Sequence, residues 1–267
     1  MVKIQHLKKC CSIILFQAGL LVSGQASALT FGIFPVYQPI QLAELNAPLV
    51  NFLNKSLSEP VYFRTTTNFG SFNKRAKQQS YDILMIAPNL GYQLSVNKTY
   101  TPVLRAAYRP QAVFVVPKTS KITSFSDLKH KAIAFAPDLA ITTKVAYKKL
   151  ADIGIQKGQY QIDNRKSHLE SFRVLQLNKA DAAAFSLSVW QALPENEKAD
   201  FRVIGLSDST PGIFLMVKDA KRYEPVKKAL LDFEKTPQGQ AYFKASKLIG
   251  YKPVTDQDLF EIKSLYQ

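Results

Sequence analysis

Short apolar runs alternate with longer amphipathic stretches along most of this 267-residue chain, and this alternation restricts its possible folds more than any other feature. The runs are apolar at nearly every position, as expected for strands that are covered on both faces. Strands of this kind, separated by helical patterns, are typical of a largely parallel sheet. The pattern predicts an α/β fold with strands at residues 30–34, 61–64, 83–87, 112–116, 132–136, 181–185, 203–206 and 213–217.

The helices are indicated by apolar spacing and by capping residues. One stripe at helical spacing follows Pro39, a residue that the first turn of a helix tolerates, and comprises Leu42, Leu45, Leu49, Leu53 and Leu57. Capping-box patterns occur at residues 124–127, 167–170 and 255–258, and Thr236 precedes Pro237 as an N-cap precedes a first-turn proline. These signals place helix starts after several of the predicted strands.

The first 28 residues have the three parts of a secretory signal peptide. Three lysines precede an apolar segment at residues 10–22, and Ala26-Ser27-Ala28 has the small-x-small pattern of a cleavage site. The apolar segment is too short to span a bilayer, so we expect cleavage after Ala28 and a periplasmic protein without stable membrane insertion. The alternative, a lipoprotein signal, lacks a small-residue box before Cys10 and Cys11. Cleavage removes both cysteines and leaves 239 residues without a disulfide or a thiol.

The chain is basic, with a formal net charge of +15 that falls to +12 when three lysines leave with the signal peptide. A basic chain suggests a nucleic-acid partner. However, the basic residues are spread along the sequence, and an exported protein rarely meets nucleic acid. We therefore expect no nucleic-acid partner and interpret the charge as a general attraction for small anions or anionic surfaces, with a solvated surface as the alternative.

The order of the elements suggests two lobes. Two long extended segments, at about residues 103–117 and 203–218, are interrupted near residues 108–110 and 208–212. Strands of this kind can cross between lobes and act as hinges. The predicted first lobe comprises residues 29–109 and 212–267, and the predicted second lobe comprises residues 110–211.

The sequence motifs of common enzyme classes are absent. There is no G-x-S-x-G elbow, no P-loop and no G-x-G-x-x-G. After residue 28 the only histidines are His130 and His168 and there is no cysteine, so we expect no metal site and no cofactor. A Ser-His-Asp triad built from distant residues stays open, although nothing in the sequence indicates one.

Polar and aromatic residues gather instead where predicted strands lead into helices, at residues 34–38, 87–92, 140–143 and 167–168. Ligands of open α/β sheets bind at such junctions, where helix N-termini present free amides. One terminus favours an anion by roughly 0.3–1 kcal/mol when exposed and by up to about 2 kcal/mol when partly buried. Several converging termini could approach the roughly 8 kcal/mol that micromolar affinity requires.

Sequence strings at these junctions carry a resemblance to a known family. They are Phe31-Gly32-Ile33-Phe34-Pro35, Tyr81-Asp82-Ile83-Leu84-Met85-Ile86-Ala87-Pro88 with Tyr92, Phe125-Ser126-Asp127-Leu128-Lys129-His130-Lys131, Ser167-His168 followed by Ala180-Asp181-Ala182-Ala183, and Gly250-Tyr251-Lys252-Pro253-Val254. In order and spacing they resemble the phosphate/phosphite/phosphonate (PhnD-like) periplasmic substrate-binding proteins of ABC transporters. The resemblance covers essentially all of residues 29–267.

The resemblance implies a type II periplasmic binding protein fold, with mixed, mostly parallel sheets, two hinge strands and a ligand held between the lobes. It also implies ligand contacts from Tyr37, Tyr92, Thr142 or Thr143, and Ser167 with His168. Asn89, at the start of a short helix, is a further candidate contact or a cap. For the two tyrosines, packing is the alternative. Where phosphonate binders have a Ser-Thr-Ser-Gly anion cradle, this chain has Leu139-Ala140-Ile141-Thr142.

These inferences together predict a periplasmic solute-binding protein that captures a small oxyanionic solute by hinge closure. The expected partner is an ABC-transporter permease, and the protein is expected to be a monomer. One alternative is a periplasmic sensor that signals to a membrane kinase. Another is an exported enzyme that uses the cleft between the lobes for catalysis.

Overall fold

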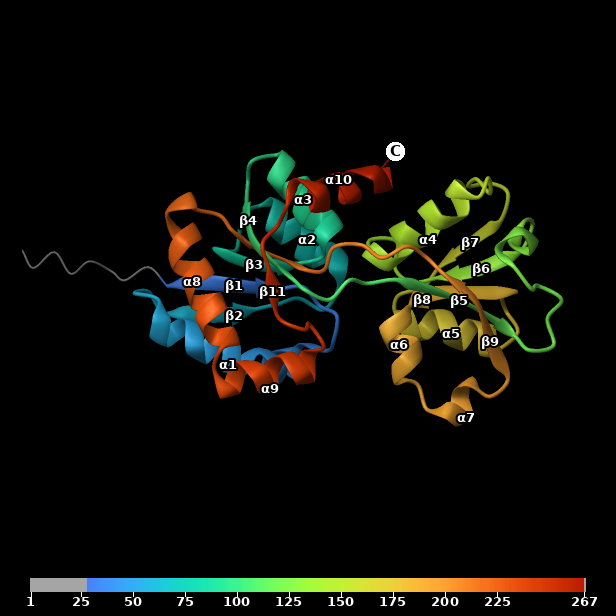
Figure 1. The fold of residues 1–267 in the computed structure, drawn as a ribbon, viewed down its shortest axis with the longest axis horizontal. Helices are drawn as coiled ribbons and strands as arrows, with labels where there is room; N and C mark the ends of the chain where they lie inside the picture. Colours follow the sequence, from blue (N-terminus) through green and yellow to red (C-terminus); the bar gives the residue numbers. More distant parts are fainter. Residues whose placement is uncertain (1–27, 267) are drawn as a thin grey trace, which may run out of the picture.

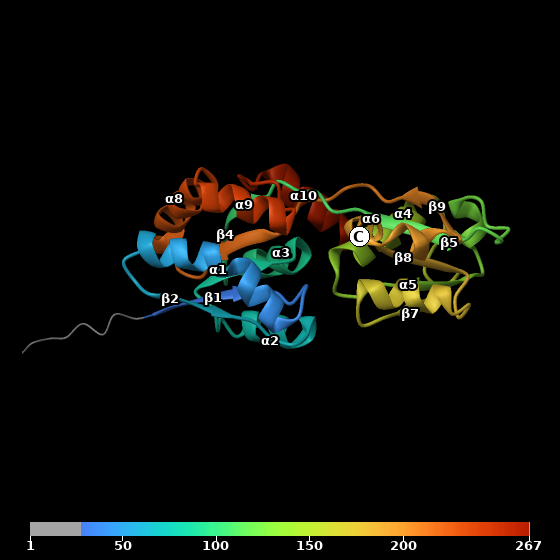
Figure 2. The same ribbon diagram turned by 90° about the horizontal axis from the view of Figure 1, so that it is seen from below.

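The computed structural model describes residues 28–266, and the predicted signal peptide lies outside the described residues. Two β-sheets lie side by side along the long axis of the molecule, each with helices on both faces (Figures 1 and 2). We refer to the six-stranded sheet and its helices as the first lobe, and to the five-stranded sheet and its helices as the second lobe.

The sheet of the first lobe has the order β11-β4-β10-β3-β1-β2. Its strands are β1 (Leu29–Ile33), β2 (Val61–Arg64), β3 (Ile83–Ile86), β4 (Thr101–Ala106), β10 (Phe214–Val217) and β11 (Tyr251–Lys252). One face packs on α1 (Pro39–Ser56), α8 (Tyr223–Glu234) and α9 (Pro237–Ser246). The other face packs on α2 (Phe69–Lys77), α3 (Pro88–Val96) and α10 (Asp256–Lys263).

The sheet of the second lobe has the order β7-β6-β8-β5-β9. Its strands are β5 (Ala112–Pro117), β6 (Ala132–Phe135), β7 (Gln161–Asn164), β8 (Ala182–Ser186) and β9 (Phe201–Leu206). Helix α4 (Ile141–Asp152) covers one face, and α5 (His168–Gln176) and α6 (Leu187–Ala192) cover the other. The short helix α7 (Glu195–Lys198) and three 3₁₀ turns, η1 (Phe125–Leu128), η2 (Ala220–Arg222) and η3 (Ser264–Tyr266), complete the described elements.

Both sheets are mixed, as expected, but the further expectation that their strand pairs are mostly parallel is wrong. Only β1–β2, β1–β3, β6–β7 and β6–β8 are parallel pairs, whereas the five remaining pairs are antiparallel. The central strands are continuous apolar runs because both of their faces are buried, not because their neighbours are parallel. Whether two neighbouring strands are parallel or antiparallel depends on the direction in which the chain re-enters the sheet. The apolar runs give no information about that direction.

The chain passes between the lobes twice, through residues 107–111 and residues 207–213, which run next to each other (Figure 1). The bond from the Thr210 amide to the Pro110 carbonyl (3.1 Å) joins the two segments. The bond from the Ala106 amide, at the end of β4, to the Ile213 carbonyl (2.8 Å) holds the second segment beside the start of the first. The two interruptions predicted in the long extended segments fall within these connections.

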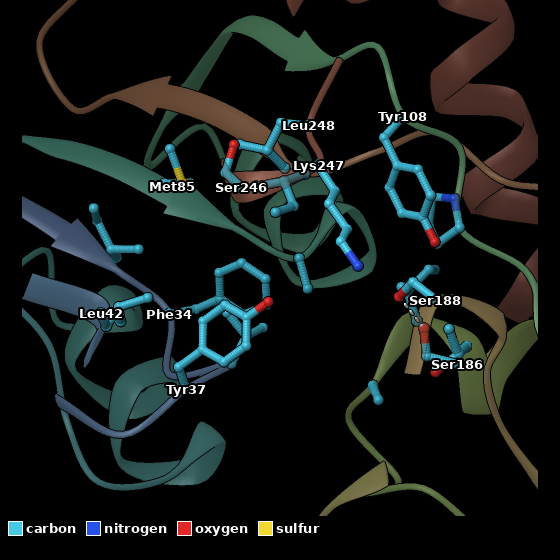
Figure 3. A pocket seen from close by; sticks show the side chains of 18 of the residues that line it. Phe34, Tyr37, Leu42, Met85, Tyr108, Ser186, Ser188, Ser246, Lys247 and Leu248 are labelled. Atoms are coloured by element: carbon cyan, nitrogen blue, oxygen red, sulfur yellow. Dashed lines mark hydrogen bonds between the residues drawn. The ribbon is translucent and has the colours of Figure 1, made fainter. Parts of the chain in front are cut away.

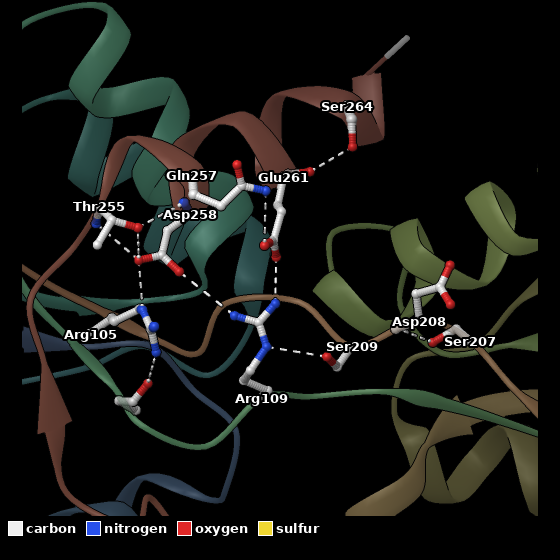
Figure 4. Close-up of polar contacts among 11 residues, drawn as sticks. Arg105, Arg109, Ser207, Asp208, Ser209, Thr255, Gln257, Asp258, Glu261 and Ser264 are labelled. Atoms are coloured by element: carbon white, nitrogen blue, oxygen red, sulfur yellow. Dashed lines mark hydrogen bonds and ion pairs between the residues drawn. The ribbon is translucent and has the colours of Figure 1, made fainter.

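The C-terminal helix is tied to the first of these connections by a cluster of charges (Figure 4). Asp258 on α10 accepts a hydrogen bond from Arg105 Nε at 2.8 Å, and Arg109 Nη1 lies 3.7 Å from its second oxygen. Arg109 also pairs with Glu261 and donates from Nε to Ser209 on the second connection (3.2 Å). Asp258 is 2% exposed and Arg105 is 15% exposed, whereas Arg109 and Glu261 stay partly open to water at 34% and 30%.

Most of the predicted helix caps are confirmed. Thr236 accepts from the Gly239 amide, and full capping boxes form at residues 124–127 and 255–258. The predicted box at Ser167 is only half present. Ser167 accepts from the Glu170 amide at 3.1 Å, but the Glu170 carboxylate accepts from the amide of Lys166 rather than from that of Ser167. An ion pair with Arg165 holds the Glu170 carboxylate at that position.

None of the helices described within residues 28–266 combines the length and the apolar character needed to cross a membrane.

Candidate functional site

A cleft with a volume of about 210 Å³ lies between the lobes. From the first lobe it is lined by the β1–α1 loop, the β3–α3 junction and the end of α9, and from the second lobe by the starts of α4 and α5 and the β8–α6 junction. Tyr108 and Pro110 line it from the connection between the lobes. Figure 3 shows Tyr37 and Ser188 approaching the space from opposite sides. The cleft therefore lies where the strand-to-helix junctions of both lobes face each other.

The start of α4 presents hydrogen-bond donors to this cleft. Ala140, Ile141 and Thr142 line it, and the first amides of a helix have no partner within the helix. The Thr142 hydroxyl is buried and has no hydrogen-bond partner among the described residues, and Thr142 is 4% exposed. Buried polar groups are normally paired, so an unpaired hydroxyl at a cleft wall indicates a place for a ligand atom.

His168 is the first residue of α5, and it lines the cleft. Its Nδ1 atom accepts a hydrogen bond from the Ser186 amide at 3.3 Å. Burial lowers the pKa of His168 to about 4, so the imidazole is neutral at neutral pH. Because Nδ1 accepts a hydrogen bond, the proton of the neutral ring lies on Nε2, where it is available as a donor.

Lys247 supplies a positive charge that the sequence did not indicate. It is the C-cap of α9, with a left-handed backbone at φ 60°, and its ammonium group points into the cleft in Figure 3. Its ammonium group forms no ion pair with a carboxylate among the described residues. In the sequence it is one of many lysines, and only the turn after α9 brings it to the site.

Three of the seven residues predicted as ligand contacts line the cleft: Tyr37, Thr142 and His168. Tyr37 is 45% exposed at the mouth, so it does not serve as a core residue. Their contact with a ligand stays a prediction.

The other four predicted contacts are not among the lining residues. Asn89 is fully buried and its Nδ2 donates to the Leu139 carbonyl at 3.0 Å, which links the two lobes. Tyr92 stacks on Tyr266, with ring centroids 6.4 Å apart. Thr143 is 1% exposed, and Ser167 caps α5. No ligand is present to test these four predictions.

The rest of the lining is dominated by apolar side chains that the sequence presented as core. Most come from the first lobe, among them Ile33, Phe34, Leu42, Met85, Ile213 and Leu248. Their strand and helix positions carry the same apolar pattern as their neighbours, so no sequence signal separates cleft from core here.

No group of three or more His, Cys, Asp or Glu within residues 28–266 is arranged to hold a metal ion. The polar groups of the cleft are hydroxyls, the Asn46 carboxamide, one neutral imidazole, one ammonium and backbone amides. Such a set binds oxyanions by hydrogen bonding and charge.

The comparison with protein families agrees with this geometry. A family model described as "ABC transporter, phosphonate, periplasmic substrate-binding protein" matches residues 31–259. No curated protein matches the chain.

Several solved structures share the fold. PhnD1 from Prochlorococcus marinus in complex with methylphosphonate has a TM-score of 0.78 and 13% identity, over 89% of this chain and 96% of that one. A binding protein component of an ABC phosphonate transporter from Pseudomonas aeruginosa has a TM-score of 0.74 and 14% identity, over 90% and 85%. XAC2383 from Xanthomonas citri bound to chloride has a TM-score of 0.75 and 18% identity, over 90% and 96%. The expected two-lobed α/β fold is confirmed.

Proposed function

The chain belongs to the periplasmic substrate-binding proteins of phosphonate ABC transporters, and we propose that it captures a small oxyanionic solute in the interlobe cleft and presents it to a membrane permease. The signal-like residues 1–28 support export and cleavage after Ala28. The chain contains none of the common enzyme motifs, and we propose binding without catalysis. The proposed binding protein is a monomer that uses no cofactor.

The observation that carries this proposal is the convergence of unpaired polar groups from both lobes. Thr142 and His168 come from the second lobe, and Lys247 comes from the first. Each offers a donor to the same space, and none of these three donors has an acceptor among the described residues. A ligand oxyanion that bridges the lobes would satisfy all three.

The proposed movement is closure of two rigid lobes, residues 29–109 with 212–267 and residues 110–211. Residues 107–111 and 207–213 are the only continuous backbone between the two sheets among the described residues, and they serve as the hinges. A ligand that contacts both lobes stabilises the closed form by its differential affinity for that form. A permease can then recognise the closed form.

The sharpest test compares two neighbouring threonines. Thr142→Val should weaken the binding of methylphosphonate about 10- to 150-fold, because a hydrogen bond to a charged group contributes about 1.5–3 kcal/mol. Thr143 is also buried with an unpaired hydroxyl, yet it does not line the cleft, so Thr143→Val is the matched control and should bind as the wild type does. Isothermal titration calorimetry measures both, with phosphate, phosphite and a sulfonate as further probes.

Equal affinities for the wild type and Thr142→Val would contradict the role of Thr142. If the wild type binds none of the four probes, the proposed oxyanion function is wrong. Melting temperatures of both variants show whether a loss of affinity reflects a loss of folding.

A further inference from the structure

One wall of the cleft is apolar and belongs almost entirely to the first lobe. Ile33 at the end of β1, Leu42 on α1 and Met85 on β3 contribute to it, together with Ile213 and Leu248. In Figure 3, Leu42 and Met85 lie on the side away from Ser186 and Ser188. The polar groups of the second lobe thus face a hydrocarbon surface across the cleft.

A small inorganic anion suits the polar side of the cleft but not its apolar side. A charged group pressed against hydrocarbon loses hydration without gaining partners, which is strongly unfavourable. Lys247 is the only Lys or Arg side chain among the residues that line this cleft. The hydroxyls, the imidazole and the ammonium therefore suit one acidic group, whereas the wall of the first lobe suits an apolar one.

The cleft is large enough for such a ligand. Its volume of about 210 Å³ exceeds the roughly 150 Å³ of an engineered apolar cavity that binds benzene. A ring or a branched chain therefore fits together with a small head group.

We propose that the ligand is an organic anion with a single acidic group and an apolar body, and that the apolar body lies against the first lobe. This inference rests on the proposed function, because it names the class of solute that the same cleft takes. The acidic group lies near Thr142, His168 and Lys247. The body lies near Leu42, Met85 and Leu248, where it displaces water from an apolar surface.

The proposal predicts that affinity increases with the length of the apolar body. Each buried methylene contributes roughly 0.8 kcal/mol, which corresponds to about a fourfold change in affinity. From methylphosphonate to butylphosphonate, three methylenes, the dissociation constant should fall by about 60-fold on the same basis. Binding of phenylphosphonate should show a more negative heat-capacity change than binding of methylphosphonate, because it buries more apolar surface.

The experiment is calorimetry on purified residues 29–267, which contain every strand of both sheets. The titrants are phosphate, methylphosphonate, ethylphosphonate, butylphosphonate and phenylphosphonate. Lys247→Gln should weaken all of them by a similar factor. Lys244→Gln is the matched control, because Lys244 is exposed and is not among the residues that line this cleft. Ile213→Thr, which places a hydroxyl in the apolar wall, should reduce the gain in affinity per methylene along the alkyl series.

These titrations distinguish the inference of an apolar body from the proposed oxyanion function. A steady rise in affinity along the alkyl series supports the inference. If methylphosphonate binds and longer chains bind equally or more weakly, the inference is overturned and the oxyanion function stands. If no titrant binds, including phosphate, the oxyanion function is overturned and the inference with it.

Discussion

Replacing Asp258 with alanine is expected to lower the melting temperature by about 6–12 °C. The change leaves Arg105, only 15% exposed, without its carboxylate, and loss of one partner of a buried pair costs about 3 kcal/mol or more. It also removes the capping box of α10. For a chain of this size each kcal/mol corresponds to about 2–4 °C. Thermal unfolding followed by circular dichroism measures the shift.

Asp232→Ala is the matched control. Asp232 also pairs with two basic side chains, Lys228 and Lys235, but all three lie at the surface, and exposed pairs contribute little to stability. Its melting temperature should therefore stay close to that of the wild type. Equal shifts in the two variants would contradict the account of the Asp258 cluster.

The effect of Asp258 should depend on pH in a defined direction. Burial opposes ionisation of this carboxyl, but the hydrogen bonds from Arg105 and Thr255 outweigh it and hold its pKa below the ordinary value. A lowered pKa in the folded state stabilises the protein above the ordinary aspartate pKa of about 3.9, and this contribution is lost as the pH falls through the lowered value. The difference between wild type and Asp258→Ala should therefore be full near neutral pH and shrink in strong acid.

The second large effect is expected at Gly212, where the two connections between the lobes touch. A Cβ at this position would overlap the carbonyl oxygen of Tyr108 and lie 2.7 Å from that of Ala106. Both are backbone atoms, one in the opposite connection and one at the end of β4, next to the Ala106–Ile213 hydrogen bond. Gly212→Ala should destabilise the protein by about 3 kcal/mol, the upper part of the range for overpacking, and should also alter closure.

Gly70→Ala is the control for this substitution. Gly70 lies within α2, and its added Cβ would meet nothing closer than 3.5 Å. Alanine favours helix over glycine by about 1 kcal/mol, so stability should rise slightly. Urea unfolding measures both variants. A stable Gly212→Ala protein with wild-type affinity for methylphosphonate would show that the connections tolerate separation and that their close contact is not needed.

Much of the fold could be predicted because both faces of the central strands are buried. Strand β3 is fully apolar, and the sequence indicated it almost to its bounds. Strand β7, at the edge of the second sheet, was missed because Gln161, Asp163 and Asn164 are polar. An edge strand needs no apolar run, so its identity depends on the neighbour with which it pairs.

Only those residues of the candidate site that belong to a recognisable local sequence pattern could be predicted. Thr142 and His168 were found because they stand at helix starts, where free amides and polar side chains gather. Lys247 was not found, because its place depends on the left-handed turn that ends α9. The apolar wall was also missed, since Leu42 and Met85 follow the same pattern as residues that are only core. Whether a cleft is polar or apolar depends on which surfaces of the two lobes face each other across it.

On binding, the two lobes are proposed to close on a solute held between them. Small-angle X-ray scattering of residues 29–267, with and without phenylphosphonate at a concentration that calorimetry shows to be saturating, tests it most directly. Closure of the lobes predicts a smaller radius of gyration with the phosphonate bound. An unchanged radius at full occupancy would contradict closure.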